Sequence, residues 1–439
     1  MENFISPIEY RYNRQTSISR KYFSHYNVLY RKFLLEVRYF QHIRATHGGG
    51  FLESLQKICC VNLFDDFDDE DFAVSVCGEI EQIEKNITNH DIKAIEYIVR
   101  RMFEHDEHKH LVHFGLTSDD IVSVISTLSI YKAYEEIYST VYSIIDGITE
   151  TKNIGSYFMG RTHGQAAIPT TFHDQLVHSY INRIKDYKLD RLVKVKFGGA
   201  INNGYTYGLL NVQHMNTVHD DFIYRLDDKL DIHRLCSHTQ TDQNAYNYKV
   251  YSNLNYLCNV LINFCQDVWE YYSRGLLYKT DSYIGSSTMP NKSNPIEFEN
   301  AEGNLKIARS MLSTYMNDMT ISRLQRDLSG STIIRNVGVV FAHVEIAVNS
   351  MRKGLRSMSV NVDAATLDIT NNEQFAGEYI QLFKKLHHKS DAYKEISDLY
   401  KGGMSSRDIA ELLGVDYTPI ERSISNMVAT NKKLVSTPQ

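Results

Sequence analysis

Hydroxyl, amine and carboxamide groups gather in one short stretch of the chain, YIGSSTMPNKSNPIEFEN, which runs from Tyr283 to Asn300. The stretch holds two of the six prolines, a Gly-Ser-Ser sequence and a lysine between polar residues. A serine hydroxyl is a poor base in water, but it can take a proton where N–H dipoles and a cation stabilise its alkoxide in a dry site. Small residues and prolines also suit a loop that closes over a ligand. The stretch therefore predicts a mobile lid that carries a reactive serine.

Five further segments combine polar residues with sequences that interrupt helices: SPIEYRY (6–12), TNHDIKAIEY (88–97), HFGLTSDD (113–120), GRTHGQAAIPTT (160–171) and RLQRDLSGSTIIR (323–335). Taken singly, each has an ordinary explanation, because Ser118 or Asp119 could cap the next helix and His90 could be a structural histidine. Together they predict one shared site at helix ends, where imidazoles transfer protons and Arg and Lys bind an anion. The residues expected to form this site are His90, His163, Ser286, Lys292, Arg326 and Arg335.

Three of these segments carry a resemblance to a known group of enzymes. GSSTMPNKSNP closely resembles the signature loop of the fumarase/aspartase superfamily, G-S-S-x-M-P-x-K-x-N-P, and every defined position is matched in order. HFGLTSDD and GRTHGQAAIPTT resemble the other two signature regions of the superfamily, in the expected order. Within the superfamily, SP…RY, TNHDIKAIEY, THGQ and QRDLSGSTIIR are similar to the adenylosuccinate lyase family in its longer bacterial form. The resemblance covers about residues 6 to 340 and weakens beyond them.

The resemblance implies a carbon–nitrogen lyase. Its members release fumarate by β-elimination from adenylosuccinate, giving AMP, and from SAICAR, giving AICAR, in purine nucleotide biosynthesis. By the family pattern, Ser286 is the base that takes the proton next to a carboxylate, and His163 is the general acid that protonates the leaving nitrogen. His90 is expected to orient the substrate, with the Asp91 carboxylate holding its ring and raising its pKa.

The family pattern also implies which residues bind substrate. The succinyl carboxylates are expected to contact Lys292, Asn294, Thr117, Ser118 and Gln240. The nucleotide, chiefly its 5′-phosphate, is expected to contact Arg11, Tyr12, Arg326, Ser331 and Arg335. Further substrate contacts are expected from Asn89, Ser287, Ser293, Asn300 and Thr332. The resemblance implies no metal and no organic cofactor, because the protein itself holds the aci-carboxylate, and it implies a homotetramer with active sites shared between subunits.

A few positions depart from the family pattern. Asn291 stands where a histidine often precedes the lid lysine, and Tyr283 stands where related chains carry an acid. THGQAA replaces the commoner THGQPA, and the segment TDQNAYNY after Gln240 lacks a histidine that relatives carry. None of these changes removes a reacting group. They bear on lid motion and substrate preference rather than on the class of reaction.

Two other functions stay open at this stage. One is another lyase of the superfamily, of the argininosuccinate lyase or fumarase type. The segment QRDLSGSTIIR argues against it, because a phosphate-binding cluster has no use in fumarase. The other is a non-catalytic structural homologue, which could lose its reacting groups freely. Against that function, the chain retains Ser286, His163 and Lys292.

Long helices are the elements that must position these groups. Between residues 121 and 150, apolar side chains recur every three or four residues, which predicts a helix about 45 Å long. Similar segments run over about 246–278, 299–319 and 335–358. Strand-like alternation is weak, so we expect an all-α fold with a central bundle of long helices that assembles with other subunits. The expected domains are an N-terminal helical domain (1–109), the central bundle (110–358) and a small C-terminal helical domain (359–439), in which SSRDIAELLG forms a capped helix.

Composition limits the classes of partner. The chain has 439 residues, a net charge of −6 and 43% hydrophobic residues, so it can form a large core and has no basic surface field for nucleic acid. No apolar run reaches the ~20 residues of a membrane span, and the first residues lack the apolar core of a signal peptide. None of the six cysteines stands in a C-x-x-C or zinc-ligand spacing, so buried free thiols are expected. We therefore expect a cytoplasmic protein.

Overall fold

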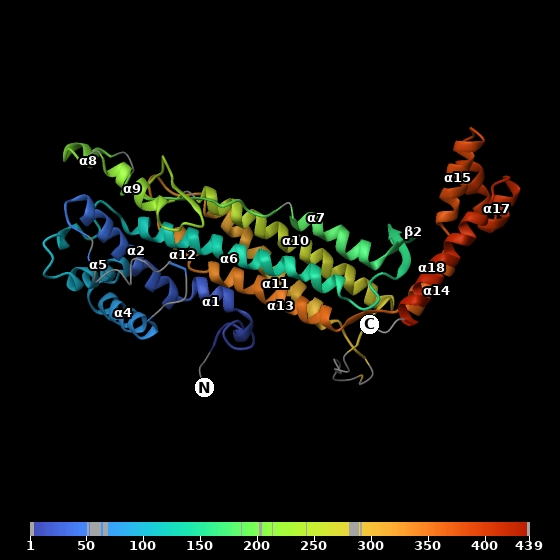
Figure 1. Cartoon of the computed structure of the whole chain (residues 1–439), viewed down its shortest axis with the longest axis horizontal. Helices are drawn as coiled ribbons and strands as arrows, with labels where there is room; N and C mark the ends of the chain where they lie inside the picture. The colour runs from blue at the N-terminus through green and yellow to red at the C-terminus, as the bar shows by residue number, and fades with distance from the viewer. Residues whose placement is uncertain are drawn as a thin grey trace. The chain divides into compact units, whose positions relative to one another are not determined.

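The computed structural model describes residues 4–50, 52, 63–64, 69–185, 187–201, 204–212, 214–242, 244–280, 289 and 292–436. Within these residues the chain is mostly helical, which confirms the predicted fold class (Figure 1). Contacts divide the chain into two compact units. Unit 1 is Met1–Thr140, Tyr187–Asn259 and Asn304–Ile346, and unit 2 is Val141–Asp186, Val260–Gly303 and Ala347–Gln439. The three-domain division at residues 110 and 359 stays a prediction.

All four long helices that the sequence predicts are present. They are α6 (Ser118–Thr149), α10 (Ala245–Ser273), α11 (Ile296–Asp318) and α13 (Val337–Arg356). The apolar period of α6 is a buried face, since Ile121, Val124 and Leu128 are each 0% exposed. Each of these helices contributes its residues to both units.

Unit 1 packs the N-terminal helices and parts of the long helices around an aromatic and aliphatic core. The rings of Tyr251 on α10 and Tyr315 on α11 lie 5.1 Å apart, and the His343 imidazole on α13 is 2.8 Å from the Asn304 amide oxygen on α11. A short parallel pair, β3 (Leu192–Val195) and β4 (Asp231–Arg234), was not predicted. The other elements of unit 1 are η1 (Asn13–Gln15), α1 (Ser17–Phe23), α2 (His25–Thr46), α4 (Glu70–Ile83), η3 (Glu84–Thr88), α5 (Asp91–Met102), η4 (Lys109–Leu111), α8 (Tyr205–Leu209), α9 (Met215–Tyr224) and α12 (Ser329–Ile334).

Unit 2 contains a β-hairpin, β1 (Tyr157–Thr162) and β2 (Gln165–Thr171), which the sequence analysis treated as a loop. A second antiparallel pair joins β5 (Leu277–Lys279) to β6 (Met358–Val360). The predicted helix in SSRDIAELLG is confirmed as α17 (Ser406–Leu412), where the Ser405 hydroxyl accepts the Asp408 N–H at 3.2 Å. The other elements of unit 2 are η5 (Asp174–His178), α7 (Ser179–Lys185), α14 (Val362–Thr370), α15 (Phe375–His387), α16 (Tyr393–Lys401) and α18 (Thr418–Ser436).

Two findings bear on the expected partners and thiols. One helical stretch, Ser329–Arg356, is long and apolar enough to cross a membrane, with a mean hydropathy of 1.4. Within its most apolar window 56% of the residues are buried inside the protein, which is the pattern of a core helix. Among the described cysteines, Cys77, Cys258 and Cys265 are free and buried, whereas Cys236 is exposed, contrary to the expected burial.

Candidate functional site

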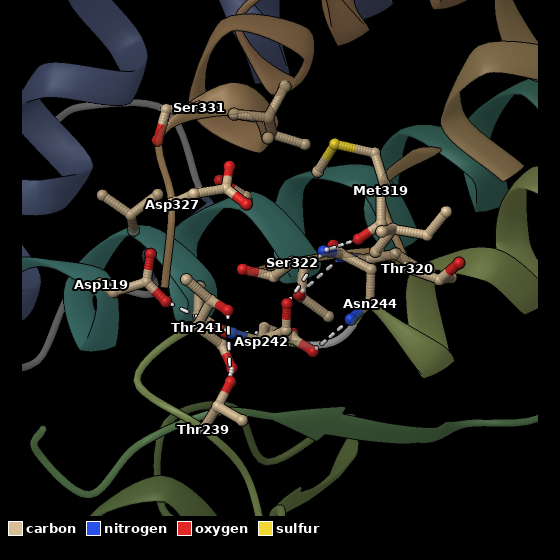
Figure 2. A pocket seen from close by; sticks show the side chains of 18 of the residues that line it. Asp119, Thr239, Thr241, Asp242, Asn244, Met319, Thr320, Ser322, Asp327 and Ser331 are labelled. Carbon is tan, nitrogen blue, oxygen red and sulfur yellow. Dashed lines mark hydrogen bonds between the residues drawn. The ribbon is translucent and has the colours of Figure 1, made fainter. Parts of the chain in front are cut away.

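Unit 1 contains a polar pocket formed by three separate segments (Figure 2). They are the first turns of α6, the chain that leads into α10 with the first turn of that helix, and the segment from the end of α11 through α12. Among the described residues that the sequence predicted for the site, Ser331 lines this pocket, and Gln240 lies between two lining residues. The other polar lining residues are Asp119, Ser123, Ser126, Thr127, Thr239, Thr241, Asp242, Asn244, Asn247, Thr320, Ser322 and Asp327.

Two carboxylates lie side by side in the wall of this pocket. An Asp119 oxygen accepts the backbone N–H of Asp242 at 3.3 Å. The Asp242 carboxylate accepts the Ser123 hydroxyl at 3.2 Å and the Asn244 backbone N–H at 2.7 Å. Burial, with a smaller contribution from neighbouring Asp119, raises the pKa of Asp242 to about 6. The pocket therefore presents one carboxylate, Asp242, whose charge changes close to neutral pH.

Two cations near these carboxylates partly offset their negative charge. Burial raises the pKa of Asp119, while Lys196 and Arg326 act in the opposite direction. Arg326 is thus electrostatically coupled to the pocket wall, as expected for a residue of an anion site. The hydroxyl of Ser331 lines the same pocket from α12.

A buried ion pair fixes the segment that begins α6. Lys196 Nζ lies 2.7 Å from Asp120 Oδ1, and both side chains are 0% exposed. Asp120 also accepts the Gly198 N–H at 2.7 Å, and Lys196 donates to the Gly199 carbonyl at 3.0 Å. Gly199 has φ +79°, and a Cβ there would lie 2.7 Å from the Gly115 carbonyl oxygen, so only glycine fits. These contacts hold the pocket segments in a fixed position.

The start of α6 differs in detail from the expected cap. The helix begins at Ser118, and the Thr117 N–H and hydroxyl both donate to Asp120 Oδ2, at 2.7 and 3.0 Å. This is the backbone-to-carboxylate half of a capping box, so neither Ser118 nor Asp119 is the cap. The Thr117 hydroxyl also accepts from Lys196 at 3.2 Å. Thr117 therefore has a structural role here, and its contact with a succinyl carboxylate stays a prediction.

The histidine expected to orient the substrate lies at the start of α5. His90 Nδ1 accepts the Lys93 N–H at 3.4 Å, and its ring is half exposed. The Asp91 carboxylate pairs with Lys32 Nζ at 2.6 Å and is 3.6 Å from the His90 ring. Burial alone would raise the pKa of Asp91, but Lys32 holds it below the usual range. The carboxylate is thus shared with a lysine that the sequence analysis did not include. Asn89 precedes this turn with φ +49° and is exposed.

The other nucleotide residues of unit 1 are placed apart from the pocket lining. Arg11 is exposed, and its guanidinium lies 6.0 Å from the ring centre of Tyr12. Thr332 on α12 and Arg335 directly after it are exposed, one and four residues from Ser331 along the chain. Exposed guanidinium groups at helix ends are available to bind phosphate. Their expected roles stay predictions.

In unit 2, His163 lies at the tip of the β1–β2 hairpin. Thr162 pairs with Gln165, so the two-residue loop is His163–Gly164. Both have positive φ, +53° and +73°, as a type I′ turn requires. Histidine rarely adopts this backbone conformation, and such residues concentrate at functional sites. The turn leaves His163 exposed, so its imidazole is accessible to a ligand.

The hairpin is anchored at its first strand. A bulge falls between Met159 and Arg161, and both guanidinium nitrogens of Arg161 donate to the Asp368 carboxylate on α14, at 3.0 and 2.6 Å. Arg274 donates to the same carboxylate at 3.2 Å. This bidentate ion pair fixes the strand that leads to His163.

The lid segment is described in part. Lys292 and Ser293 are exposed, and Asn294 is half buried, immediately before α11. The Asn300 amide on α11 donates to the Ser350 hydroxyl at 2.7 Å, so this predicted substrate contact has a partner within the protein. Ser286 and Ser287 lie outside the described residues, as do Tyr283 and Asn291.

Several pocket residues were not predicted from the sequence. Asp119 lies in HFGLTSDD, where it was considered only as a helix cap. Asp242 and Asn244 lie in TDQNAYNY, which was noted only as a departure from the family pattern. The signal was present as polar residues clustered before a long apolar helix, but no periodicity places such a segment against α6. Ser123 gave no signal, since it lies within the helical period.

Comparison with known families covers most of the chain. Residues 53–311 match the family described as lyase, and residues 322–428 match the family described as adenylosuccinate lyase C-terminal. The second match extends the resemblance well past residue 340, where the sequence analysis expected it to weaken. The two matches together include the hairpin, the lid segment and the pocket residues other than Met319, Thr320 and Ile321.

Curated relatives match over nearly their full lengths. An adenylosuccinate lyase from Legionella pneumophila (strain Corby) is 31% identical over 92% of this chain and 89% of its own. One from Buchnera aphidicola subsp. Schizaphis graminum is 32% identical, over 91% and 88%. One from Escherichia coli (strain K12) is 30% identical, over 91% and 88%.

Solved structures show the same fold at low sequence identity. A fumarate lyase from Mesorhizobium sp. BNC1 superposes with a TM-score of 0.64 at 15% identity, covering 96% of this chain and 97% of that one. A 3-carboxy-cis,cis-muconate lactonizing enzyme from Pseudomonas putida gives 0.64 at 16% identity, covering 95% and 97%. At these identities the likeness concerns the fold alone.

Proposed function

The chain belongs to the adenylosuccinate lyase family of the fumarase/aspartase superfamily, and from that premise we propose how its residues carry out the reaction. The chain is a carbon–nitrogen lyase that releases fumarate from adenylosuccinate, giving AMP, in purine nucleotide biosynthesis. The companion substrate SAICAR would give AICAR by the same elimination. The proposal assigns no step to a metal or an organic cofactor.

The observation that carries the acid assignment is the turn at the tip of the hairpin. His163 is held in a left-handed backbone conformation that leaves its imidazole exposed, and Arg161 anchors the strand behind it. A protonated imidazole in this position can donate to the exocyclic nitrogen of the purine as the carbon–nitrogen bond breaks. In this proposal His163 is the general acid.

The base and the carboxylate contacts come from the lid segment. We assign proton removal to Ser286 by the family pattern. Its oxygen would take the proton from the carbon next to a succinyl carboxylate, and the resulting aci-carboxylate would be stabilised by a cation. The Lys292 side chain is exposed six residues later and can supply that charge. Asn294 would add a neutral donor to the same carboxylate.

The unit 1 pocket suits the neutral part of the nucleotide. Its wall presents the carboxylates of Asp119 and Asp242, which accept hydrogen bonds from hydroxyl and amino donors but repel a phosphate. The sugar hydroxyls and the base of a nucleotide offer such donors. The phosphate would then bind the cations that flank the pocket, Arg326 and Arg335, together with the Ser331 hydroxyl.

We further propose that the working form is a homotetramer with each active site shared between subunits, in the cytoplasm. The supporting observation is that the pocket belongs to unit 1, whereas His163 and Lys292 belong to unit 2. An exposed His163 gains a dry environment only when other chain covers it. The free thiols of Cys77, Cys258 and Cys265 suit a reducing compartment.

Separate assays with four candidate substrates test the function directly. Purified protein is mixed separately with adenylosuccinate, SAICAR, argininosuccinate and fumarate plus ammonia, and the change in fumarate is followed by ultraviolet absorbance. We expect turnover of the first two alone. Turnover of argininosuccinate, or of fumarate with ammonia, would favour another lyase of the superfamily, and turnover of nothing would favour a non-catalytic homologue.

A further inference from the structure

Three side chains directly after the hairpin converge on one point of unit 2. Among the residues that the structure describes, His173, Asp174 and His178 are the group of three whose possible metal-ligand atoms all lie within 4.8 Å of one another. Asp174 Oδ1 is 3.7 Å from His173 Nδ1 and 3.7 Å from His178 Nε2. The two imidazole rings meet edge to face, with centres 5.2 Å apart. One carboxylate oxygen is thus placed between two ring nitrogens.

The local backbone explains why residues five apart share a face. The segment Asp174–His178, η5, is a single π-helical turn, in which the Ser179 N–H bonds to the Asp174 carbonyl. In an ordinary α-helix, residues five apart point about 140° away from each other, but the wider π-turn brings them together. Such turns occur frequently at functional sites. The π-turn therefore places His178 beneath His173.

A neighbouring hydroxyl orients the carboxylate. Thr171, the last residue of β2, donates from Oγ1 to Asp174 Oδ2 at 2.8 Å, and the Asp174 N–H donates back to the same hydroxyl at 3.1 Å. This arrangement uses one carboxylate oxygen and leaves the other toward the two histidines. Outer hydrogen bonds of this kind fix the ligands of metal sites.

From this geometry we propose that His173, Asp174 and His178 bind a divalent transition-metal ion of the zinc type. Two imidazoles and a carboxylate are ligands that Zn²⁺ prefers, with bonds of about 2.0–2.1 Å. Ligands at that distance in a tetrahedron are about 3.4 Å apart. A small side-chain shift would shorten the two oxygen–nitrogen separations of 3.7 Å to that value. A fourth position is left for water.

A surface ion pair is the competing explanation for the same contacts. Protonated His178 could simply pair with Asp174 four residues earlier, since both side chains are more than half exposed. An ion pair does not account for the second imidazole, however, because two protonated rings on one carboxylate repel each other. A metal ion requires both rings neutral, whereas the ion pair requires a protonated ring. Acid should therefore weaken metal binding and strengthen the ion pair.

The site lies at the base of the hairpin and stands apart from the proposed reaction. Thr171 pairs with Tyr157 at the open end of β1–β2, while His163 lies at the turn. A bound metal would brace the junction of β2 and η5. It would take no part in the proton transfers assigned above, so metal binding and fumarate release can be measured separately.

The test is zinc binding to the full-length protein after dialysis against EDTA. Titration with Zn²⁺ at pH 7.5, followed by calorimetry and by the metal content after gel filtration, is expected to give one ion per chain with a Kd of about 10 µM or tighter. Asp174→Asn and His178→Ala are each expected to weaken binding at least about tenfold. At pH 5.5, about one unit below the usual imidazole pKa, wild-type affinity is also expected to fall about tenfold or more.

His25→Ala is the matched control. His25 is exposed and lies 3.0 Å from the Glu81 carboxylate, and among the described residues it belongs to no cluster of three possible metal ligands. It is expected to bind Zn²⁺ as the wild type does. Binding that survives Asp174→Asn and His178→Ala, or that His25→Ala weakens equally, would overturn the proposal in favour of the ion pair. The rate of fumarate release from metal-free protein tests the proposed enzymatic function separately, whatever the outcome of the zinc titrations.

Discussion

The pocket of unit 1 and the hairpin of unit 2 present their functional groups in opposite ways. In the pocket, the central carboxylate is held in place: Asp242 accepts two hydrogen bonds, and the fully buried Asp120–Lys196 pair fixes the segment behind it. On the hairpin, His163 is exposed at a strained turn, and Lys292 of the lid segment is exposed as well. The first region is organised before a ligand arrives, whereas the second offers its groups to something outside.

From this difference we expect the pocket to serve binding, and the hairpin and lid segment to serve proton transfer. Binding a ligand to preformed acceptor groups costs little conformational entropy, because these groups are already ordered in the free protein. Proton transfer needs a dry environment, and exposed groups obtain it only when other chain or a lid covers them. Residues of the first region are therefore expected to affect stability when changed, and residues of the second to affect turnover. The predictions below test that division.

The largest expected effect belongs to the hairpin. His163→Ala is expected to lower kcat by about 10²- to 10⁴-fold, since positioned acid catalysis contributes that much. The thermal unfolding midpoint should change little, because the ring is exposed. Steady-state kinetics and a thermal melt measure both quantities. Near-normal kcat would remove His163 from its assigned role.

The buried ion pair is expected to give the largest loss of stability. Lys196→Met leaves Asp120 charged and buried, which costs about 3–5 kcal/mol in comparable proteins. The matched control is Lys249→Met, because Lys249 pairs with Asp190 at 3.3 Å with both side chains more than half exposed. That control is expected to change the unfolding free energy by less than about 1 kcal/mol. Urea unfolding measures the loss of unfolding free energy in each variant. Equal losses in the two variants would contradict the account.

Asp242 is expected to respond to pH with a definite sign. Its pKa is about 6 in the folded protein against a usual 3.8, so the folded state binds the extra proton between these values. The contribution of Asp242 to stability therefore rises as pH falls from 7 to 4, and its ionised form costs at most about 3 kcal/mol at pH 7. Asp242→Asn should stabilise the protein at pH 7 and have little effect at pH 4.5.

Urea unfolding at both pH values measures this effect, with exposed Asp228→Asn as the control. The control is expected to behave like the wild type at each pH. A variant that is less stable than the wild type at pH 7 would show that the Asp242 carboxylate stabilises the pocket rather than straining it.

The smallest effect is expected at the exposed edge of the site. Arg335→Ala should raise KM for adenylosuccinate about tenfold, the value of one charge-assisted phosphate contact, with kcat changed less. Stability should not change, since the side chain is exposed. An unchanged KM would remove the phosphate contact from Arg335.

The sequence predicted the long helices and the candidate catalytic residues, but not the pocket. Helices such as α6 and α10 follow from a period of three to four apolar residues, which is a local property. The hairpin escaped notice because β1 and β2 are short and their turn, His163–Gly164, lacks the usual Asn or Asp. Asp119 and Asp242 lie 123 residues apart, so their contact depends on tertiary packing that no local pattern records. The ion pair between Asp91 and Lys32 was missed for the same reason.

Subunit complementation tests the central claim most directly, namely that a pocket from one chain and a hairpin from another complete each active site. His163→Ala protein, expected to be nearly inactive, and Arg326→Ala protein, expected to cleave low concentrations of adenylosuccinate about tenfold more slowly than the wild type, are mixed, dissociated and reassembled. Cleavage of adenylosuccinate at low concentration is then measured. If sites are shared, random reassembly restores about a quarter of the wild-type activity, because that fraction of sites draws both intact parts from different chains. Activity that stays at the level of the separate variants would contradict the account.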